Sequence, residues 1–265
     1  MNRTFRFQTF HFQTSHLPLA LTLLLAALPA ARAGADDDGE IPFDVAEVFF
    51  ELNDTDGDLG VHSLIDGGPW KTLEIEGPDE RTNLQIRLRS RLRQQGLTEL
   101  FFESAEPTFD ELAPERFFRR FPEGEYEVEG TTLKGDELES AAVVTHLMPA
   151  PPGNLQVNGF ATPEDCDEDP LPAVSEPFVI TWDAVTRSHP DLGRRDEPIT
   201  VVRYQVVIER EDPEPLKFTI DLPPDVTEVE IPAGFAGSGE EWKLEVLVRE
   251  ESFNQTATET CFEVD

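Results

Sequence analysis

The chain has 265 residues and carries 54 acidic side chains against 21 basic ones, which gives a formal net charge of −33. Such an acidic surface disfavours nucleic acid and anionic membranes as partners, because both need a basic protein surface. The apolar fraction of 38% is too high for a fully disordered acidic chain, and two cysteines exclude a four-cysteine zinc site.

The first residues have the pattern of a secretory signal peptide. Arg3 and Arg6 precede an uncharged apolar stretch at 17–31, and Ala31-Arg32-Ala33 offers a small-x-small cleavage site. The stretch is shorter than the roughly 20 residues of a membrane-spanning helix and contains two prolines. We therefore expect residues 1–33 to be removed, a secreted or periplasmic protein, and no membrane span after cleavage. Cleavage leaves 18 basic and 54 acidic residues, a net charge of −36.

Two domains are predicted for the mature chain. Residues 34–40 form an acidic, flexible start, and the Pro-rich segment 149–153 reads as a linker because proline cannot donate hydrogen bonds within a sheet. It separates residues 41–148 from residues 154–265. Short period-2 segments dominate both halves, which is typical of β-sandwiches. The predicted fold class is mainly β, with two β-sandwich-like domains in tandem and one short helical segment in the first.

The helical segment is predicted at about residues 109–121. Thr108 and Glu111 have the spacing of a capping box. Pro114 either kinks the segment or starts a second short helix at its first position. Phe117 and Phe121 are spaced i, i+4 and share one face. This face packs on the β core in one interpretation and forms a ligand-binding aromatic platform in the other.

Three aspartates at every second position follow the first predicted strand. Asp54, Asp56 and Asp58 supply the oxygen ligands that calcium prefers. An EF-hand loop beginning at Asp54 would need Gly and Glu where Leu59 and Ile65 stand. The alternative is a hairpin, because Asp-Gly is a favoured turn pair. The sequence thus leaves two interpretations, a calcium-binding acidic loop or a plain turn. No cofactor other than this possible calcium ion is expected.

Four arginines alternate with apolar residues in the segment 86–93. A strand through this segment would place Arg87, Arg89, Arg91 and Arg93 on one face. Such a stripe could bind an anionic glycan, a phosphate or an acidic segment. The alternative is pairing with Glu74 and Glu76 of the preceding strand.

The two cysteines are predicted to pair. Cys166 and Cys261 lie 95 positions apart, and export brings the chain into an oxidising compartment. The alternative is two free buried thiols.

The second half resembles a fibronectin type III domain. The resemblance is carried by strand-like segments in a characteristic order, with an inward Trp182 and an inward Tyr204. These segments are Pro152–Val157, Phe178–Trp182, Tyr204–Ile208, Thr227–Pro232, Trp242–Val248, Asn254–Thr256 and Cys261–Val264. The family usually has Tyr where Trp242 stands. The resemblance implies a seven-stranded sandwich that serves as a spacer or binding module.

Residues 41–149 resemble an uncharacterised β-rich domain of secreted bacterial proteins that carry fibronectin type III modules. The segments that resemble it are Asn53–Gly60 and Leu97–Pro107. No activity comes with this resemblance.

Enzymatic signatures are poor. His62, His146 and His189 lack the spacing of a zinc site, and no nucleophile elbow or phosphate-binding glycine loop occurs. We therefore expect a secreted, non-enzymatic binding, adhesion or structural module with an extracellular protein or glycan as partner. The expected recognition loops are Thr186–Ile199 and Glu250–Thr256, because loops on a rigid sandwich carry function. The alternative is an accessory module or small enzyme acting on extracellular glycans. The oligomeric state is left open.

Overall fold

The computed structural model of the protein describes residues 40–163, 166, 170–210, 214–237 and 240–265. These residues belong to one compact unit. The predicted signal peptide and residues 34–39 of the acidic start lie outside the described residues. In the part of the chain that the structure describes, no helix is long and apolar enough to cross a membrane.

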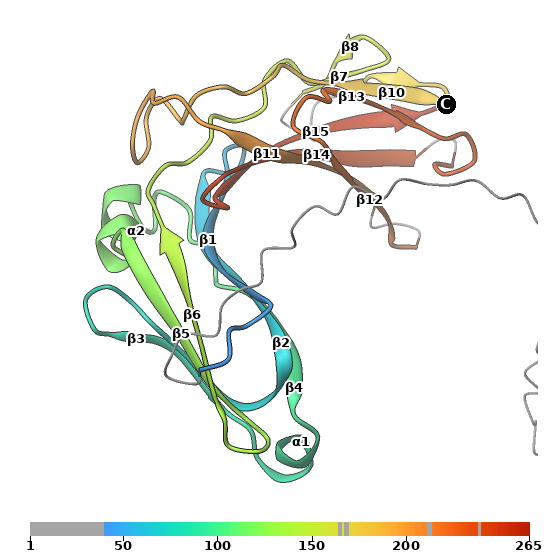
Figure 1. The fold of residues 1–265 in the computed structure, drawn as a ribbon. Coiled ribbons are helices and arrows are strands. Elements are labelled where there is room, and N and C mark those ends of the chain that lie inside the picture. The colour runs from blue at the N-terminus through green and yellow to red at the C-terminus, as the bar shows by residue number, and fades with distance from the viewer. Residues whose placement is uncertain (1–39, 164–165, 167–169, 211–213, 238–239) are drawn as a thin grey trace, which may run out of the picture. The chain divides into compact units, whose positions relative to one another are not determined.

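The fold is mainly β, as predicted (Figure 1). Two short helices accompany the strands: α1 (Ser90–Gln95) and α2 (Pro114–Arg120). The strands of the first half are β1 (Val45–Asn53), β2 (Asp58–Glu76), β3 (Thr82–Arg87), β4 (Leu97–Glu103), β5 (Gly124–Thr132) and β6 (Glu137–Val144). Those of the second half are β7 (Gln156–Val157), β8 (Phe160–Ala161), β9 (Ala173–Val174), β10 (Phe178–Thr181), β11 (Val201–Arg210), β12 (Leu216–Leu222), β13 (Glu228–Ile231), β14 (Glu240–Glu250) and β15 (Gln255–Val264).

One large sheet runs through both halves. Its strand order is β12-β11-β14-β15-β1-β2-β5-β6, with β3 and β4 paired to β2 and β9 paired to β15. The halves meet where β1 lies parallel to β15, with Glu51 opposite Gln255 and Leu52 opposite Thr256. Each half keeps its own hydrophobic core. The tandem-domain arrangement stays a prediction, and the sheet shows that the two cores share a backbone hydrogen-bond ladder.

The first half is built around a hairpin of β1 and β2. Val48, Phe50 and Leu52 alternate into the core, so the intervening residues of β1 lie on the opposite face of the sheet. Strand β2 pairs with β1 and β4 along its first part and with β3 and β5 along its second. The ladder is irregular at residues 67–69, where Gly-Gly-Pro weakens regular strand pairing.

The predicted helix is present but shorter than expected. α2 begins at Pro114, in agreement with the reading in which this proline starts a helix, and residues 108–112 form turns. The Phe117 ring lies 5.3 Å from the Phe50 ring, centroid to centroid, and both are buried. The aromatic face therefore packs on the β core and forms no exposed platform.

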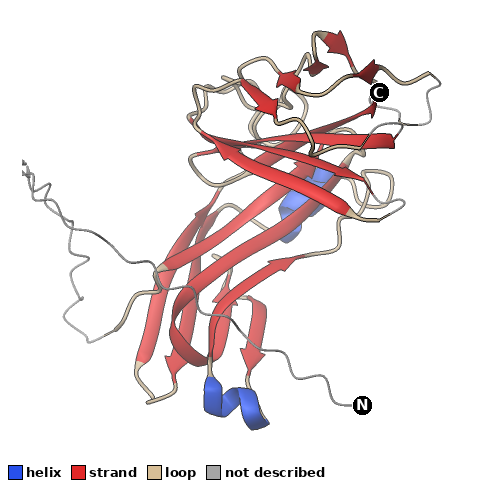
Figure 2. Ribbon diagram, turned by 90° about the vertical axis from the view of Figure 1, so that its right-hand side faces the viewer, coloured by secondary structure: helices blue, strands red, loops and turns tan. Residues whose placement is uncertain are grey.

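The second half is a β-sandwich, the architecture that the resemblance to fibronectin type III domains implies. β12, β11, β14 and β15 form one layer, and β13, β10, β7 and β8 form the other (Figures 1 and 2). The predicted inward Trp182 and Tyr204 pack together with ring centroids 5.4 Å apart, and the Tyr204 hydroxyl accepts a hydrogen bond from the Val185 amide. Trp242 is fully buried in the same core and stacks near the Arg210 guanidinium.

The loops expected to recognise a partner also make contacts with the first half, and recognition by them stays a prediction. In the loop 186–199, His189 Nε2 lies 2.9 Å from Asp54 Oδ1, and Arg194 pairs with Glu123. In the loop 250–256, Asn254 is fully buried. The Pro-rich segment is also packed, since Met148 is buried and its carbonyl accepts from the His189 amide. Ser188, His189 and Leu192 are buried in these contacts, and most other residues of the loop 186–199 are exposed.

Candidate functional site

The predicted disulfide is present. Cys166 and Cys261 are bonded, with Cα atoms 5.3 Å apart. Cys261 lies on β15 and is buried, so the bond ties the segment after β8 to the strand that joins the two halves.

The three aspartates form the turn of the β1–β2 hairpin, which is the alternative reading of that motif. Gly57 has φ +65° and its amide bonds to the Asn53 carbonyl. Asp54 is engaged by His189, while burial and the nearby Glu106 raise the pKa of Asp58 to about 6. The carboxylates of the turn do not gather into a group of three ligand atoms within 4.8 Å, whereas another group of described residues does. Calcium binding by Asp54, Asp56 and Asp58 remains an untested prediction without a converging ligand set.

The four arginines do not share one strand face, which corrects the predicted stripe. β3 ends at Arg87, Arg89 is the N-cap of α1, and Arg91 and Arg93 lie on that helix. The predicted pairing with Glu74 is also replaced, because Glu74 accepts hydrogen bonds from Thr82 and Gln85. Figures 1 and 2 show α1 at the end of the sheet farthest from the second half. Anion binding by these arginines therefore loses its geometric basis.

A groove on one face of the large sheet collects the most chemically varied side chains of both halves. Its volume is about 400 Å³. The lining alternates along each strand, so these residues share a face. The first half contributes Glu47, Phe49, Glu51, His62, Leu64, Phe101 and Glu103, and the second contributes Arg203, Gln205, Val207, Lys217, Thr219, Glu245, Leu247, Arg249 and Gln255. We call this the sheet groove.

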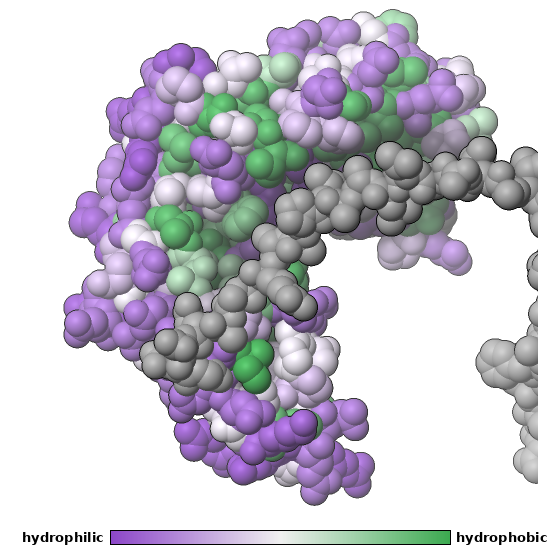
Figure 3. All heavy atoms as spheres, in the orientation of Figure 1, coloured by the Kyte–Doolittle hydropathy of each residue, from purple (hydrophilic) through white to green (hydrophobic). Residues whose placement is uncertain are grey.

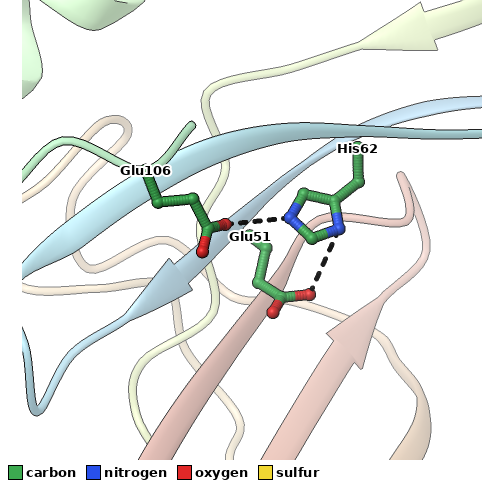
Figure 4. A group of neighbouring side chains, drawn as sticks. All are labelled: Glu51, His62 and Glu106. Atoms are coloured by element: carbon green, nitrogen blue, oxygen red, sulfur yellow. Dashed lines mark hydrogen bonds and ion pairs between the residues drawn. The ribbon is translucent and has the colours of Figure 1, made fainter. Parts of the chain in front are cut away.

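His62 lies at the centre of a buried group beside the sheet groove (Figure 4). Its side chain comes from β2 and is 3% exposed. Nε2 lies 2.9 Å from Glu106 Oε1, and Nδ1 lies 3.7 Å from Glu51 Oε2. Glu51 comes from β1 and Glu106 from the segment after β4, so three separate chain segments meet at one imidazole.

Burial and charge shift the protonation of this group. Burial alone lowers the pKa of His62, but the hydrogen bond with Glu106 and the charges of Glu51, Glu106 and Glu103 outweigh it and raise the pKa above its ordinary value. Burial raises the pKa of Glu51, although His62 and a hydrogen bond from Gln255 oppose it. The site therefore favours an imidazolium ion held between carboxylates.

Aromatic rings and cations complete the walls of the sheet groove. The rings of Phe49 and Phe101 lie 5.5 and 6.1 Å from that of His62. The Arg249 guanidinium lies over Phe49 at 4.5 Å and pairs with Glu47. Burial, together with Glu51 and Glu259, raises the pKa of Glu245 to about 8. The groove thus offers an aromatic ring, planar hydrogen-bonding groups and a carboxyl that holds its proton near neutral pH.

Sequence patterns point only weakly to this site. His62 lacks the spacing of a zinc motif, so no local pattern marks it as a ligand. The hairpin places His62 opposite Phe49 and Gly60 opposite Glu51, so the Asp-Gly turn was a usable signal for those two neighbours. No local sequence pattern points to Glu106 or to the groove residues of the second half. The groove residues of the second half lie more than 90 positions after those of the first half.

No protein-family model and no curated protein matches the sequence. Among solved structures, a two-domain fibronectin type III segment of chicken tenascin aligns with 83% of this chain and 98% of its own length, at 11% identity and a TM-score of 0.30. The FN1–FN3 domains of chicken CNTN1 align with 85% of this chain and 66% of their own length, at 9% identity and a TM-score of 0.29. The sandwich architecture of the second half rests on its strand order and core packing.

Proposed function

We propose that the protein is a secreted binding module that holds an extracellular glycan in the sheet groove. The observation that carries this proposal is the composition of the groove, where an exposed ring stands among planar hydrogen-bonding side chains. Phe101 is 58% exposed and lies beside the polar groups of both halves. A sugar ring presents an apolar C–H face together with many hydroxyls. The Phe101 ring complements the C–H face, and the polar side chains of the groove complement the hydroxyls.

The polar side chains offer both donors and acceptors to hydroxyl groups. Gln205 and Gln255 donate to Asp221 and Glu51, which fixes their amides and leaves their carbonyl oxygens available as acceptors. The Arg249 guanidinium is fixed by Phe49 and Glu47. Side chains held in this way lose little conformational entropy on binding, which favours affinity.

The surface around the groove suits a hydrated ligand. Figure 3 shows a mainly hydrophilic exterior with separate apolar patches on the face in view. A large continuous apolar area would indicate a protein interface of the obligate kind. The hydrophilic character of the face in view supports a glycan as the proposed ligand.

A glycan array with the mature wild-type protein tests this function. Phe101→Ala should weaken binding to the recognised glycan by about tenfold or more, because the stacking surface is lost. Phe160→Ala is a matched control, since Phe160 is also 58% exposed but lies on β8, away from the groove. Absence of any glycan binding, or equal losses in both variants, would contradict the proposal.

A second candidate function is hydrolysis of the bound glycan. One observation favours it: Glu245 lines the groove, and its pKa of about 8 keeps the carboxyl protonated near neutral pH, as a general acid requires. Incubation of wild-type protein with the recognised glycan distinguishes the two functions. If the wild-type protein cleaves the glycan and Glu245→Gln abolishes the cleavage, the protein is an enzyme. If the glycan stays intact, the hydrolysis function is contradicted and the binding function stands.

A further inference from the structure

The group around His62 has the donor atoms of a metal site. One ligand atom each from Glu51, His62 and Glu106 lies within 4.8 Å of the other two. Within the described residues, this is the group of three such side chains that the fold brings together. An ion bound at about 2.0–2.2 Å from each ligand needs these atoms roughly 3–4 Å apart. The 2.9 Å contact to Glu106 is made by Nε2 and the 3.7 Å contact to Glu51 by Nδ1, so an ion that binds one ring nitrogen requires the carboxylate on the other side to rotate towards it.

The charge of the group is unbalanced. Glu103 lies directly opposite His62 in the β2–β4 register, so three carboxylates surround one imidazole. Among the residues that the structure describes, no lysine or arginine pairs with Glu51, Glu103 or Glu106. A histidine that binds a metal ion is neutral, so metal binding releases the His62 proton. A divalent cation in its place offsets two of the three negative charges instead of one, and partial burial makes that compensation more valuable.

The ligands are held by the strands and their neighbours. The His62 ring lies beside the rings of Phe49 and Phe101, which limits its rotation. Gly60 gives Glu106 its place, because a Cβ at this position would lie 2.4 Å from Glu106 Oε1. The Glu51 and Glu106 side chains are 20% and 24% exposed, so their carboxylates can rotate by the small amount that closes the ligand set.

We propose that Glu51, His62 and Glu106 bind one divalent transition-metal ion, such as zinc, at the wall of the sheet groove. The mixed nitrogen and oxygen donors fit zinc or a similar ion, whereas calcium takes oxygen ligands. Glu51 and His62 line the groove, so the free coordination positions of the ion face it and can bind water or a ligand hydroxyl. This inference goes beyond glycan binding, since the ion binds without any glycan.

Zinc titration of the chelator-treated mature protein tests the site by calorimetry. We expect one zinc ion per chain, with affinity lowered at least tenfold by His62→Gln and by Glu106→Gln. Glu103→Gln is the matched control, because it removes the same charge from the same neighbourhood without removing a ligand atom. It should change the affinity less than threefold. No stoichiometric binding, or equal losses in all three variants, would overturn the proposal and indicate diffuse attraction to an acidic surface.

A measurement on the wild-type protein covers the case in which a variant does not fold. X-ray absorption of the protein loaded with one equivalent of zinc should show scattering from a single imidazole and from oxygen ligands. A shell of oxygen alone would refute the site. Both experiments are independent of the glycan array, so failure of one proposal is distinguishable from failure of the other.

Discussion

Asn254 provides a direct test of how the two halves are joined. Its side chain is fully buried at the start of β15. Its Oδ1 accepts from the Phe50 amide at 2.8 Å, and its Nδ2 donates to the carbonyls of Thr145 at 2.9 Å and Leu147 at 3.3 Å. One amide therefore satisfies three backbone groups that belong to the first half and to the segment leading out of it.

Asn254→Ala leaves these three backbone groups without their partner. A buried polar group that loses its hydrogen bond costs about 1–3 kcal/mol. The small cavity left by the substitution can admit water to some of them, so we expect the lower part of that range for each. The free energy of unfolding should fall by about 3–4 kcal/mol, a large fraction of the 5–15 kcal/mol typical of a domain.

Urea unfolding followed by circular dichroism and tryptophan fluorescence measures this change. Trp70 reports on the first half, and Trp182 and Trp242 report on the second. The wild type should unfold in one transition with both probes, and the variant should shift to lower urea. Asn83→Ala is the control, because Asn83 is exposed, and it should cost less than about 0.5 kcal/mol. A loss below about 1 kcal/mol for Asn254→Ala would refute the assigned role of this residue.

Three further predictions follow from single features, each measured in the presence of a chelator. The Cys166–Cys261 bond closes a loop of 95 residues, so its reduction should lower the free energy of unfolding by about 4–5 kcal/mol. A loss below about 1 kcal/mol in urea unfolding would contradict this. The Glu245 pKa, raised from 4.5 to about 8, means that the folded state holds a proton that the unfolded state has lost, so stability is highest below pH 4.5 and falls as pH rises through 8. Glu245→Gln should therefore gain about 2 kcal/mol over wild type at pH 9, after allowance for the partial exposure of the side chain, with no gain at pH 4; an equal difference at both pH values would refute the assignment. Gly60→Ala should displace Glu106 and lower the pKa of His62 in an NMR titration, and an unchanged or higher value would contradict the hydrogen bond between them.

The local parts of the fold follow from local patterns. The alternation of Val48, Phe50 and Leu52 with Phe49 and Glu51 indicates a strand, and the Asp-Gly pair favours a hairpin as one of the two interpretations of the aspartate motif. The pairing of the cysteines followed from their even number and the predicted compartment. In each case the interaction that forms the structure lies within a few residues or is covalent.

The segment 88–95 shows where a local pattern is ambiguous. Leu88 and Leu92 fit a period of two, but they are also spaced i, i+4, which suits a helix equally well. Ser90 has φ +52°, which interrupts the strand, and α1 then ends at Gly96, whose amide bonds to the Leu92 carbonyl. Two apolar positions are too few to distinguish the two periods.

The joining of the halves and the sheet groove lay beyond local patterns. β1 and β15 pair across about 200 positions, and Glu106 reaches His62 from a segment without regular structure. Contacts of this kind depend on the packing of two cores against each other. The sequence accordingly predicts recognition on the loops Thr186–Ile199 and Glu250–Thr256 and does not predict their contacts with the first half through His189 and Asn254.

The central claim is that both halves build one binding site, and affinity measurements on paired variants test it most directly. Phe101 belongs to β4 and Gln205 to β11, on opposite sides of the sheet groove. With a glycan identified on the array, calorimetry should show that Phe101→Ala and Gln205→Ala each lower the affinity by about tenfold, while Phe160→Ala leaves it unchanged. Loss in the variant of one half alone, or unchanged affinity in both, would contradict a shared site.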